Sequence, residues 1–230
     1  MNKKLSITLS RKELIFGWIY LLLQLLVIPI AAVFLNELFS LRLSETELNF
    51  VLFAINFIAT TVLMRKLLTV GGLVAVSNLG RTIGSVLQGF GFYWLGSTLV
   101  MLLINAIDPN FYNVNDATIY NMATENYPMI FISTVILAPV AEELLYRGVV
   151  FGGIGKKSIL LAFIVTVLGF SAMHVVGYIG NYTPPHLLLC LLQYFPPSIV
   201  LCYTYLRADT IWAPIILHML INSIAMFAMR

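Results

Sequence analysis

The chain has 230 residues, of which 60% are hydrophobic and 10% are charged, and its mean hydropathy is +0.94. Ordinary soluble domains are about 45–50% apolar and about 25% charged, so this composition excludes a soluble globular protein and predicts a polytopic membrane protein. The formal net charge of +3 is not gathered into a basic stripe with interleaved aromatic residues, which excludes nucleic acid as an expected partner.

Seven apolar stretches are long enough to cross a bilayer as helices, which takes about 20 residues each. The first is longer than the apolar core of a cleaved signal peptide, so we expect it to remain as a span. The predicted spans are 14–35, 49–64 (or 49–68), 83–107, 128–151 (or 128–154), 158–179, 186–206 and 211–229. We expect an interfacial or partly re-entrant connection at 71–81, an external loop without regular structure at 108–127, and a kink or break at Pro196-Pro197. The connection at 71–81 and the break at Pro196-Pro197 leave a count of six or of eight spans as alternatives.

The basic residues predict the orientation of the bundle. With a cytoplasmic N-terminus, eleven of the thirteen lysines and arginines fall on the cytoplasmic side, as the positive-inside rule requires, and only Arg42 and Arg230 fall outside. The eleven are Lys3, Lys4, Arg11, Lys12, Arg65, Lys66, Arg81, Arg147, Lys156, Lys157 and Arg207. We therefore predict an all-α, multi-pass bundle in a bacterial plasma membrane. Residues 1–230 form one membrane domain, with spans 1–3 and the external loop in 1–127 and the core that carries the site in 128–230.

Two adjacent carboxylates and an arginine lie in the fourth predicted span, where charged groups are costly unless they pair or line a polar cavity. Glu143 and Arg147 are four positions apart, in the order that favours a helical ion pair, so we expect this pair to be structural. Glu142 points about 100° away around the helix and is left free to face a cavity. Pro139 deprives the carbonyl of Val135 of its usual donor, which predicts a kinked, polar segment that admits water.

Later spans supply three more polar side chains at interior depth. His174 and Glu142 lie sixteen positions on either side of Ser158, so an antiparallel hairpin places them at the same height, roughly 24 Å from the turn. His218 and Asn222 are four positions apart and share a helix face. Either one alone is better explained as a structural hydrogen bond between helices. A static scaffold has little use for all four groups, so together they predict a reactive site.

The stretch 142–147, Glu-Glu-Leu-Leu-Tyr-Arg, resembles the EExxxR motif of the CAAX-protease and bacteriocin-processing membrane peptidases (the CPBP or Abi family). Phe170 and His174 match the FxxxH motif of that family, and His218 and Asn222 match its HxxxN motif. The resemblance covers about 137–225 and leaves the N-terminal half without a family motif. The family includes the endopeptidase that removes the last three residues of prenylated proteins, and bacterial members linked to peptide maturation or bacteriocin immunity. The resemblance implies an intramembrane endopeptidase.

The four groups suggest a mechanism. Glu142, assisted by His174, would activate a water for attack on an amide carbonyl, a contribution of about 10²–10⁴-fold. His218 and Asn222 would donate hydrogen bonds to the oxyanion, and losing one such donor costs about 10²–10³-fold. Glu143 and Arg147 would support the site by fixing the rotation of the helix.

A zinc version of the site stays open. Glu142, His174 and His218 are also a recognised type of catalytic zinc set, and the family has been labelled both metalloprotease and glutamate protease. We favour water activation without a metal, because the chain lacks an HExxH motif that would preorganise both histidines on one helix. No cofactor is therefore required, and zinc is the alternative.

Two other functions remain as rivals. One is a non-proteolytic membrane regulator or immunity protein that binds a partner through its helices, and the other is a small transporter with a Glu/His proton relay. Transport is disfavoured because the chain shows no two-fold repeat of broken helices. The expected partners are the lipid bilayer and a membrane-associated, lipidated or leader peptide. A cytoplasmic basic rim would favour acidic peptides, although topology already explains its charges; it comprises Arg81, Lys156, Lys157 and Arg207.

Overall fold

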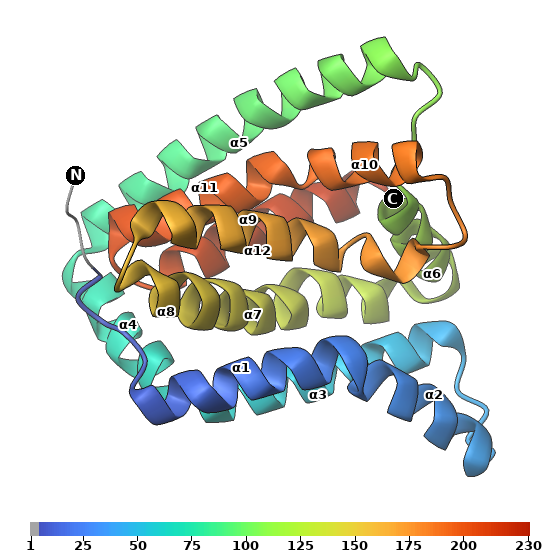
Figure 1. Ribbon diagram of the computed structural model, residues 1–230, viewed down its shortest axis with the longest axis horizontal. Coiled ribbons are helices and arrows are strands. Elements are labelled where there is room, and N and C mark those ends of the chain that lie inside the picture. The colour runs from blue at the N-terminus through green and yellow to red at the C-terminus, as the bar shows by residue number, and fades with distance from the viewer. Residues whose placement is uncertain (1–4) are drawn as a thin grey trace.

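The computed structural model describes residues 5–230, which form a bundle of helices (Figure 1). This confirms the all-α, membrane-type fold, and Lys3 and Lys4 of the predicted basic side lie outside the described residues. The elements are α1 (Arg11–Leu26), α2 (Ile28–Leu38), α3 (Glu45–Leu63), α4 (Arg65–Ser77), α5 (Leu79–Ile107), α6 (Val114–Ile132), η1 (Ser133–Leu137), α7 (Ala138–Glu143), η2 (Leu144–Phe151), α8 (Gly152–Gly155), α9 (Ile159–Met173), η3 (Val176–Tyr178), α10 (Pro184–Gln193), α11 (Phe195–Ala208) and α12 (Trp212–Ala228). In Figure 1, α1 and α3 run along one side of the bundle, α5 runs along the opposite side, and the later helices lie between them.

Several helices have the length and composition of membrane spans. Within residues 5–230, four stretches pass this test: Glu45–Leu63, Leu79–Ile107, Val114–Gly155 and Pro184–Ala208. The bent pair α1 and α2 makes a fifth if it is one span, and α9 and α12 are apolar but shorter, at 15 and 17 residues. The chain is therefore an integral membrane protein, while the seven-span count and the N-terminal orientation stay predictions.

The first predicted span consists of two helices bent by 50° at Val27. Pro29 occupies the first turn of α2, where its missing N–H and its ring cannot continue the ladder of α1. Helix α1 itself starts at a capping box, because the Ser10 hydroxyl accepts from the Glu13 amide and the Glu13 carboxylate accepts from the Ser10 amide. The sequence reasoning found the span and missed this bend.

The prediction of an irregular loop at 108–127 is wrong. The Asn113 side chain caps α6 by accepting from the amides of Asn115 and Asp116, so an asparagine read as a turn signal starts a helix. Helix α6 then kinks at Asn126, whose φ of −148° and ψ of 82° are not helical. Beyond the kink the chain stays helical through η1, α7, η2 and α8 to Gly155.

Three other boundaries differ from the sequence pattern. The predicted connection at 71–81 is helical, since it comprises the end of α4 and the start of α5. Helix α9 ends at Met173, which places His174 at a helix terminus instead of in its middle. The predicted break near the double proline is present and falls at Tyr194, so both prolines sit in the first turn of α11, where a missing N–H is tolerated.

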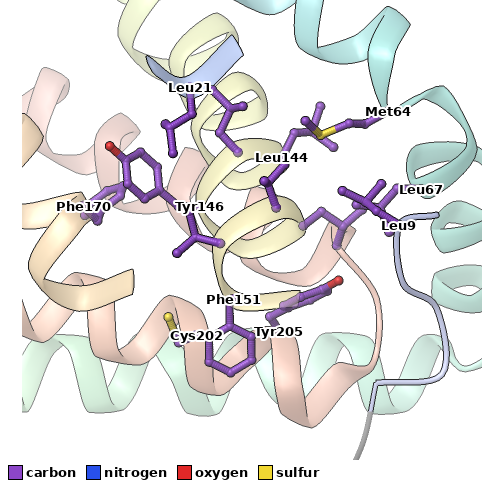
Figure 2. Close-up of a cluster of buried hydrophobic side chains, with 14 of the residues drawn as sticks. Leu9, Leu21, Met64, Leu67, Leu144, Tyr146, Phe151, Phe170, Cys202 and Tyr205 are labelled. Carbon is purple, nitrogen blue, oxygen red and sulfur yellow. The ribbon is translucent and has the colours of Figure 1, made fainter. Parts of the chain in front are cut away.

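The segment η2 lies at the centre of the largest apolar cluster (Figure 2). Leu144, Leu145 and Phe151 of this segment are fully buried. Side chains from several other elements close around it: Leu9, Leu21, Met64, Leu67, Phe170, Cys202 and Tyr205. Packing of this density fixes the rotation of the helix that carries Glu142, Glu143 and Arg147.

Gly89 marks the close approach of α5 to the later helices. A Cβ atom at this position would lie 2.4 Å from the Thr204 Oγ1 atom and 2.7 Å from the Leu217 Cδ2 atom, whereas a Cβ at Gly91 would meet nothing within 4 Å. We expect Gly89→Val to lower the melting temperature in detergent through overpacking, which costs about 1–3 kcal/mol. Gly91→Val, the same change on the same helix, should leave the melting temperature near the wild-type value. Equal effects of the two substitutions would contradict this packing.

Candidate active site

Pi-helical turns flank α7, the short helix that carries Glu142 and Glu143. Both η1 and η2 are π-helices, a rare geometry that often occurs at functional sites. In a ladder that bonds residue i to i+5, the missing N–H of Pro139 is the one that would reach the Thr134 carbonyl. That carbonyl instead accepts from Asn222 Nδ2 at 2.8 Å. The prediction of a freed carbonyl near Pro139 is therefore correct in kind, but the one that finds a side-chain donor belongs to Thr134 and not to Val135.

The predicted ion pair is present inside the bundle. Arg147 Nη1 lies 2.8 Å from Glu143 Oε1, and both side chains have no exposed surface. The guanidinium is also held by Ser198, since Nη2 donates to the Ser198 carbonyl at 3.1 Å and to its hydroxyl at 3.2 Å. Its Cζ atom lies 4.4 Å from the centroid of the Phe170 ring. Arg147, counted above among the cytoplasmic cations, is thus a buried residue of the core.

Glu143 has a second partner that the sequence reasoning missed. The same Oε1 atom that binds Arg147 accepts a hydrogen bond from His218 Nδ1 at 2.8 Å. A carboxylate accepts, so Nδ1 of His218 carries the proton and Nε2 is turned toward Glu142. The arrangement resembles the carboxylate–histidine pair of a hydrolytic triad, in which the carboxylate stabilises the imidazolium. Its only signal in the sequence was the presence of a second glutamate next to Glu142 and of a histidine on a later span.

Glu142 is the carboxylate left facing open space. Its Oε2 atom lies 4.0 Å from His218 Nε2, and its side chain is 13% exposed. This separation is too long for a direct hydrogen bond and short enough for one water to contact both atoms. Within residues 5–230, no side chain or amide donates a hydrogen bond to the Glu142 carboxylate.

His174 lies at the end of α9 with its ring held from two sides. Its Nδ1 atom donates to the Phe170 carbonyl at 2.8 Å, which leaves Nε2 as an acceptor in the neutral ring. The Tyr194 ring stacks on the imidazole, with centroids 4.2 Å apart and planes at 22°. The nearest histidine to Glu142 is His218, and in the described part of the chain no hydrogen bond joins Glu142 to His174.

One cavity of about 650 Å³ brings these groups together. Glu142, His174, His218 and Asn222 all line it, so the structure gathers the four residues predicted to be catalytic. The N-terminal helices also line the cavity, with Gln24, Asn49 and Asn56 from α1 and α3 and with Tyr93 and Ser97 from α5. Sequence reasoning assigned no role to these residues, although intramembrane amides were a usable signal.

The charge of the cavity differs from the expectation of a basic rim. Its charged lining residues are Glu142 and Asp116, and no lysine or arginine of residues 5–230 lines it. Lys156 Nζ instead donates to the Leu9 carbonyl, and Arg81 Nε donates to the Arg207 carbonyl, so these bases tie chain segments together outside the cavity. The suggested preference for acidic peptides loses its basis.

The predicted zinc ligands do not form a metal site. Among residues 5–230, no three histidine, cysteine, aspartate or glutamate side chains are grouped closely enough to hold a metal ion. His174 and His218 each use Nδ1 in a hydrogen bond and keep Nε2, as metal-bound histidines do, so it is the spacing of the groups and not the state of the rings that disfavours zinc. The side chains as arranged do not fit zinc, so the reaction proposed below includes no metal step.

The fold and the cavity define an integral membrane protein with a Glu/His/Asn site inside a helical bundle. Residues 124–224 match the family model described as Rce1-like, type II CAAX prenyl endopeptidase Rce1-like. The match includes all seven residues of the three motifs, and it bears out the predicted resemblance to the CAAX-protease family. No curated protein and no solved structure significantly matches the chain.

Proposed function

We propose that the chain is an intramembrane endopeptidase that hydrolyses a peptide bond of a membrane-associated, lipidated or leader peptide. The observation that carries this proposal is the convergence of Glu142, His174, His218 and Asn222 on one cavity between helices. The match to an endopeptidase family over the same residues supports it. We also propose a bacterial plasma membrane as its location, with the basic ends of the helices on the cytoplasmic side.

Water activation is the task of Glu142 and His174. Glu142 faces the cavity and lies 4.0 Å from His218 Nε2, too far for a direct hydrogen bond, so its carboxylate is available to take a proton from a water beside it. Nε2 of His174 lacks a proton when Nδ1 donates to Phe170, so it can accept the second hydrogen of that water. Two acceptors around one water hold its lone pair toward the scissile carbonyl.

Oxyanion stabilisation is the task of His218 and Asn222. In the doubly protonated form that this role requires, the charge of the His218 ring is compensated by Glu143 at Nδ1, and Nε2–H, which lies beside Glu142 at the cavity, is the donor. The Asn222 amide uses one N–H for the Thr134 carbonyl, which fixes its orientation and leaves its second N–H as a donor. The water oxygen bonds to the carbonyl carbon, and the C–N bond then breaks. The proton taken by Glu142 passes to the leaving amine.

A proteomic comparison tests this function. Membranes from cells with the wild-type chain are compared with membranes from cells with Glu142→Ala, at matched amounts of inserted protein. We expect at least one cleavage product of a membrane-associated peptide to be lost in the variant, with its uncleaved precursor accumulating. Identical peptide profiles together with intact cellular function of the variant would favour the alternative, a non-proteolytic regulator or immunity protein that binds a partner.

A further inference from the structure

We propose that Tyr194, anchored by Asp116, is a positioning residue that holds the His174 ring for catalysis; this rests on the proposed endopeptidase function. The flat contact is the first observation. The Tyr194 ring and the His174 imidazole are stacked with centroids 4.2 Å apart, while Phe170 lies on the imidazole at 4.8 Å and 50°. The imidazole therefore contacts two aromatic rings, and the Tyr194 ring is the one parallel to it.

The hydroxyl of Tyr194 is anchored in turn by the start of α6. It lies 3.0 Å from Asp116 Oδ1, to which it donates, and it accepts from Asn115 Nδ2 at 3.1 Å. Asp116 is further held by Gln193 Nε2 at 3.5 Å. Three elements that are distant in the sequence, α6, α9 and the α10–α11 break, therefore meet at one tyrosine.

His174 needs such support because of where it lies. Helix α9 ends at Met173, so the imidazole projects from a terminus and has one hydrogen bond, from Nδ1 to the Phe170 carbonyl. A single bond allows the ring to tilt about that contact, whereas a stacked ring fixes its plane and the direction of Nε2. Misplacing a catalytic group by about 1 Å can cost about 10²-fold in rate.

This contact also gives a role to two features that the proposed reaction does not use. The break between α10 and α11 falls at Tyr194, and without it the ring would continue along a straight helix. Asp116 is the one aspartate that lines the cavity, and its closest described partner is the Tyr194 hydroxyl. A purely structural role, in which the network only ties α6 to the bundle, makes different predictions.

Spectroscopy of the histidines tests the stack independently of any protease activity. The chain has three histidines, so ring-labelled histidine in detergent gives few resonances, which single His-to-Gln variants assign. We expect the His174 ring resonances to be shifted by the adjacent tyrosine ring, to move strongly in Tyr194→Leu, and to move little in Tyr194→Phe. Resonances of His186, which lies in a separate aromatic cluster, should stay in place. A His174 signal unchanged in Tyr194→Leu would overturn the proposal.

Kinetics on the cleaved peptide test the consequence. We expect Tyr194→Leu to lower kcat by about 10- to 100-fold with little change in KM, because the ring is misplaced while binding persists. Tyr194→Phe and Asp116→Leu both keep the stack and lose the hydrogen bond that anchors it, so each should lower kcat by a similar and smaller factor. Asp116→Asn keeps an acceptor and should retain most of the rate. Tyr203→Leu is the matched control, since Tyr203 lies on α11 with its hydroxyl on Gln88, away from the cavity.

The outcomes separate the two proposals. A change confined to KM, or equal losses in Tyr194→Leu and Tyr203→Leu, would show that Tyr194 does not act through His174. If Tyr194→Leu does not fold, Tyr194→Phe and Asp116→Leu test the anchoring bond instead: similar partial losses of kcat at unchanged KM support the proposal, and wild-type rates in both overturn it. If the wild-type protein cleaves nothing, the endopeptidase function fails, and the histidine spectra still decide whether Tyr194 holds the ring.

Discussion

Replacing Glu142 by glutamine is expected to lower the cleavage rate by about 10²–10⁴-fold, the range of a lost general base. The amide has the shape of the carboxylate and cannot take the proton from water. The fold should survive, because the contact of Glu142 with His218 is long, at 4.0 Å, and its side chain already faces the cavity. The measurement is kcat of the purified variant on the peptide identified in membranes, with its melting temperature alongside.

Glu37→Gln is the matched control for this substitution, because Glu37 is an exposed carboxylate on α2 outside the cavity. Its rate should equal that of the wild type. Wild-type enzyme treated exhaustively with a chelator should also keep its rate, whereas a loss restored only by Zn²⁺ would show that Glu142 works through a metal. Near-normal cleavage by Glu142→Gln would remove the basis for the proposed mechanism.

Replacing Arg147 by methionine is expected to destabilise the bundle by about 3–5 kcal/mol, because it removes the buried guanidinium and leaves the Glu143 carboxylate with His218 as its one remaining partner among the described residues. Both groups of this pair lack exposed surface, so water cannot solvate the carboxylate that remains. The guanidinium bonds to Ser198 would be lost as well. The free energy of unfolding in mixed detergent micelles measures the effect.

The double variant Glu143→Gln/Arg147→Met makes this prediction sharper. Removing both charges should recover most of the free energy of unfolding, since neither charge of the buried pair remains. Its cleavage rate should stay low, because His218 has lost the carboxylate that accepts from its Nδ1 and would compensate the charge of the ring. Recovery of rate together with stability would show that Glu143 serves packing alone, and an unchanged stability of Arg147→Met would contradict the buried pair.

The site residues could be predicted from the sequence because polar side chains inside a bilayer cost free energy and are rare there. Four such side chains lie at interior depth in apolar spans, and this position alone indicated a shared function: Glu142, His174, His218 and Asn222. The helical fold followed from hydropathy for the same reason. These properties depend on residue type and periodicity, which a single chain displays directly.

Other features depend on contacts between segments and were not predictable. The hydrogen bond of His218 to Glu143 requires the relative rotation of two helices, which the spacing of neither helix gives. The helix at 114–126 was mistaken for a loop because an asparagine that caps a helix resembles one that forms a turn. The bend at Val27 follows from Pro29, which the apolar pattern of the span concealed.

The part of the cavity lining that comes from α1 and α3 bears on which peptides the site could accept. Gln24 and Asn49 line the cavity from these helices, and so does Asn56, whose Oδ1 accepts from Tyr20. An unwound peptide inside a bilayer must have its backbone groups satisfied, and side-chain amides can do this. All of these residues precede the family-matched segment at 124–224. Substitutions in this part of the lining should therefore change which peptide is cleaved more than they change the arrangement of Glu142 and His218.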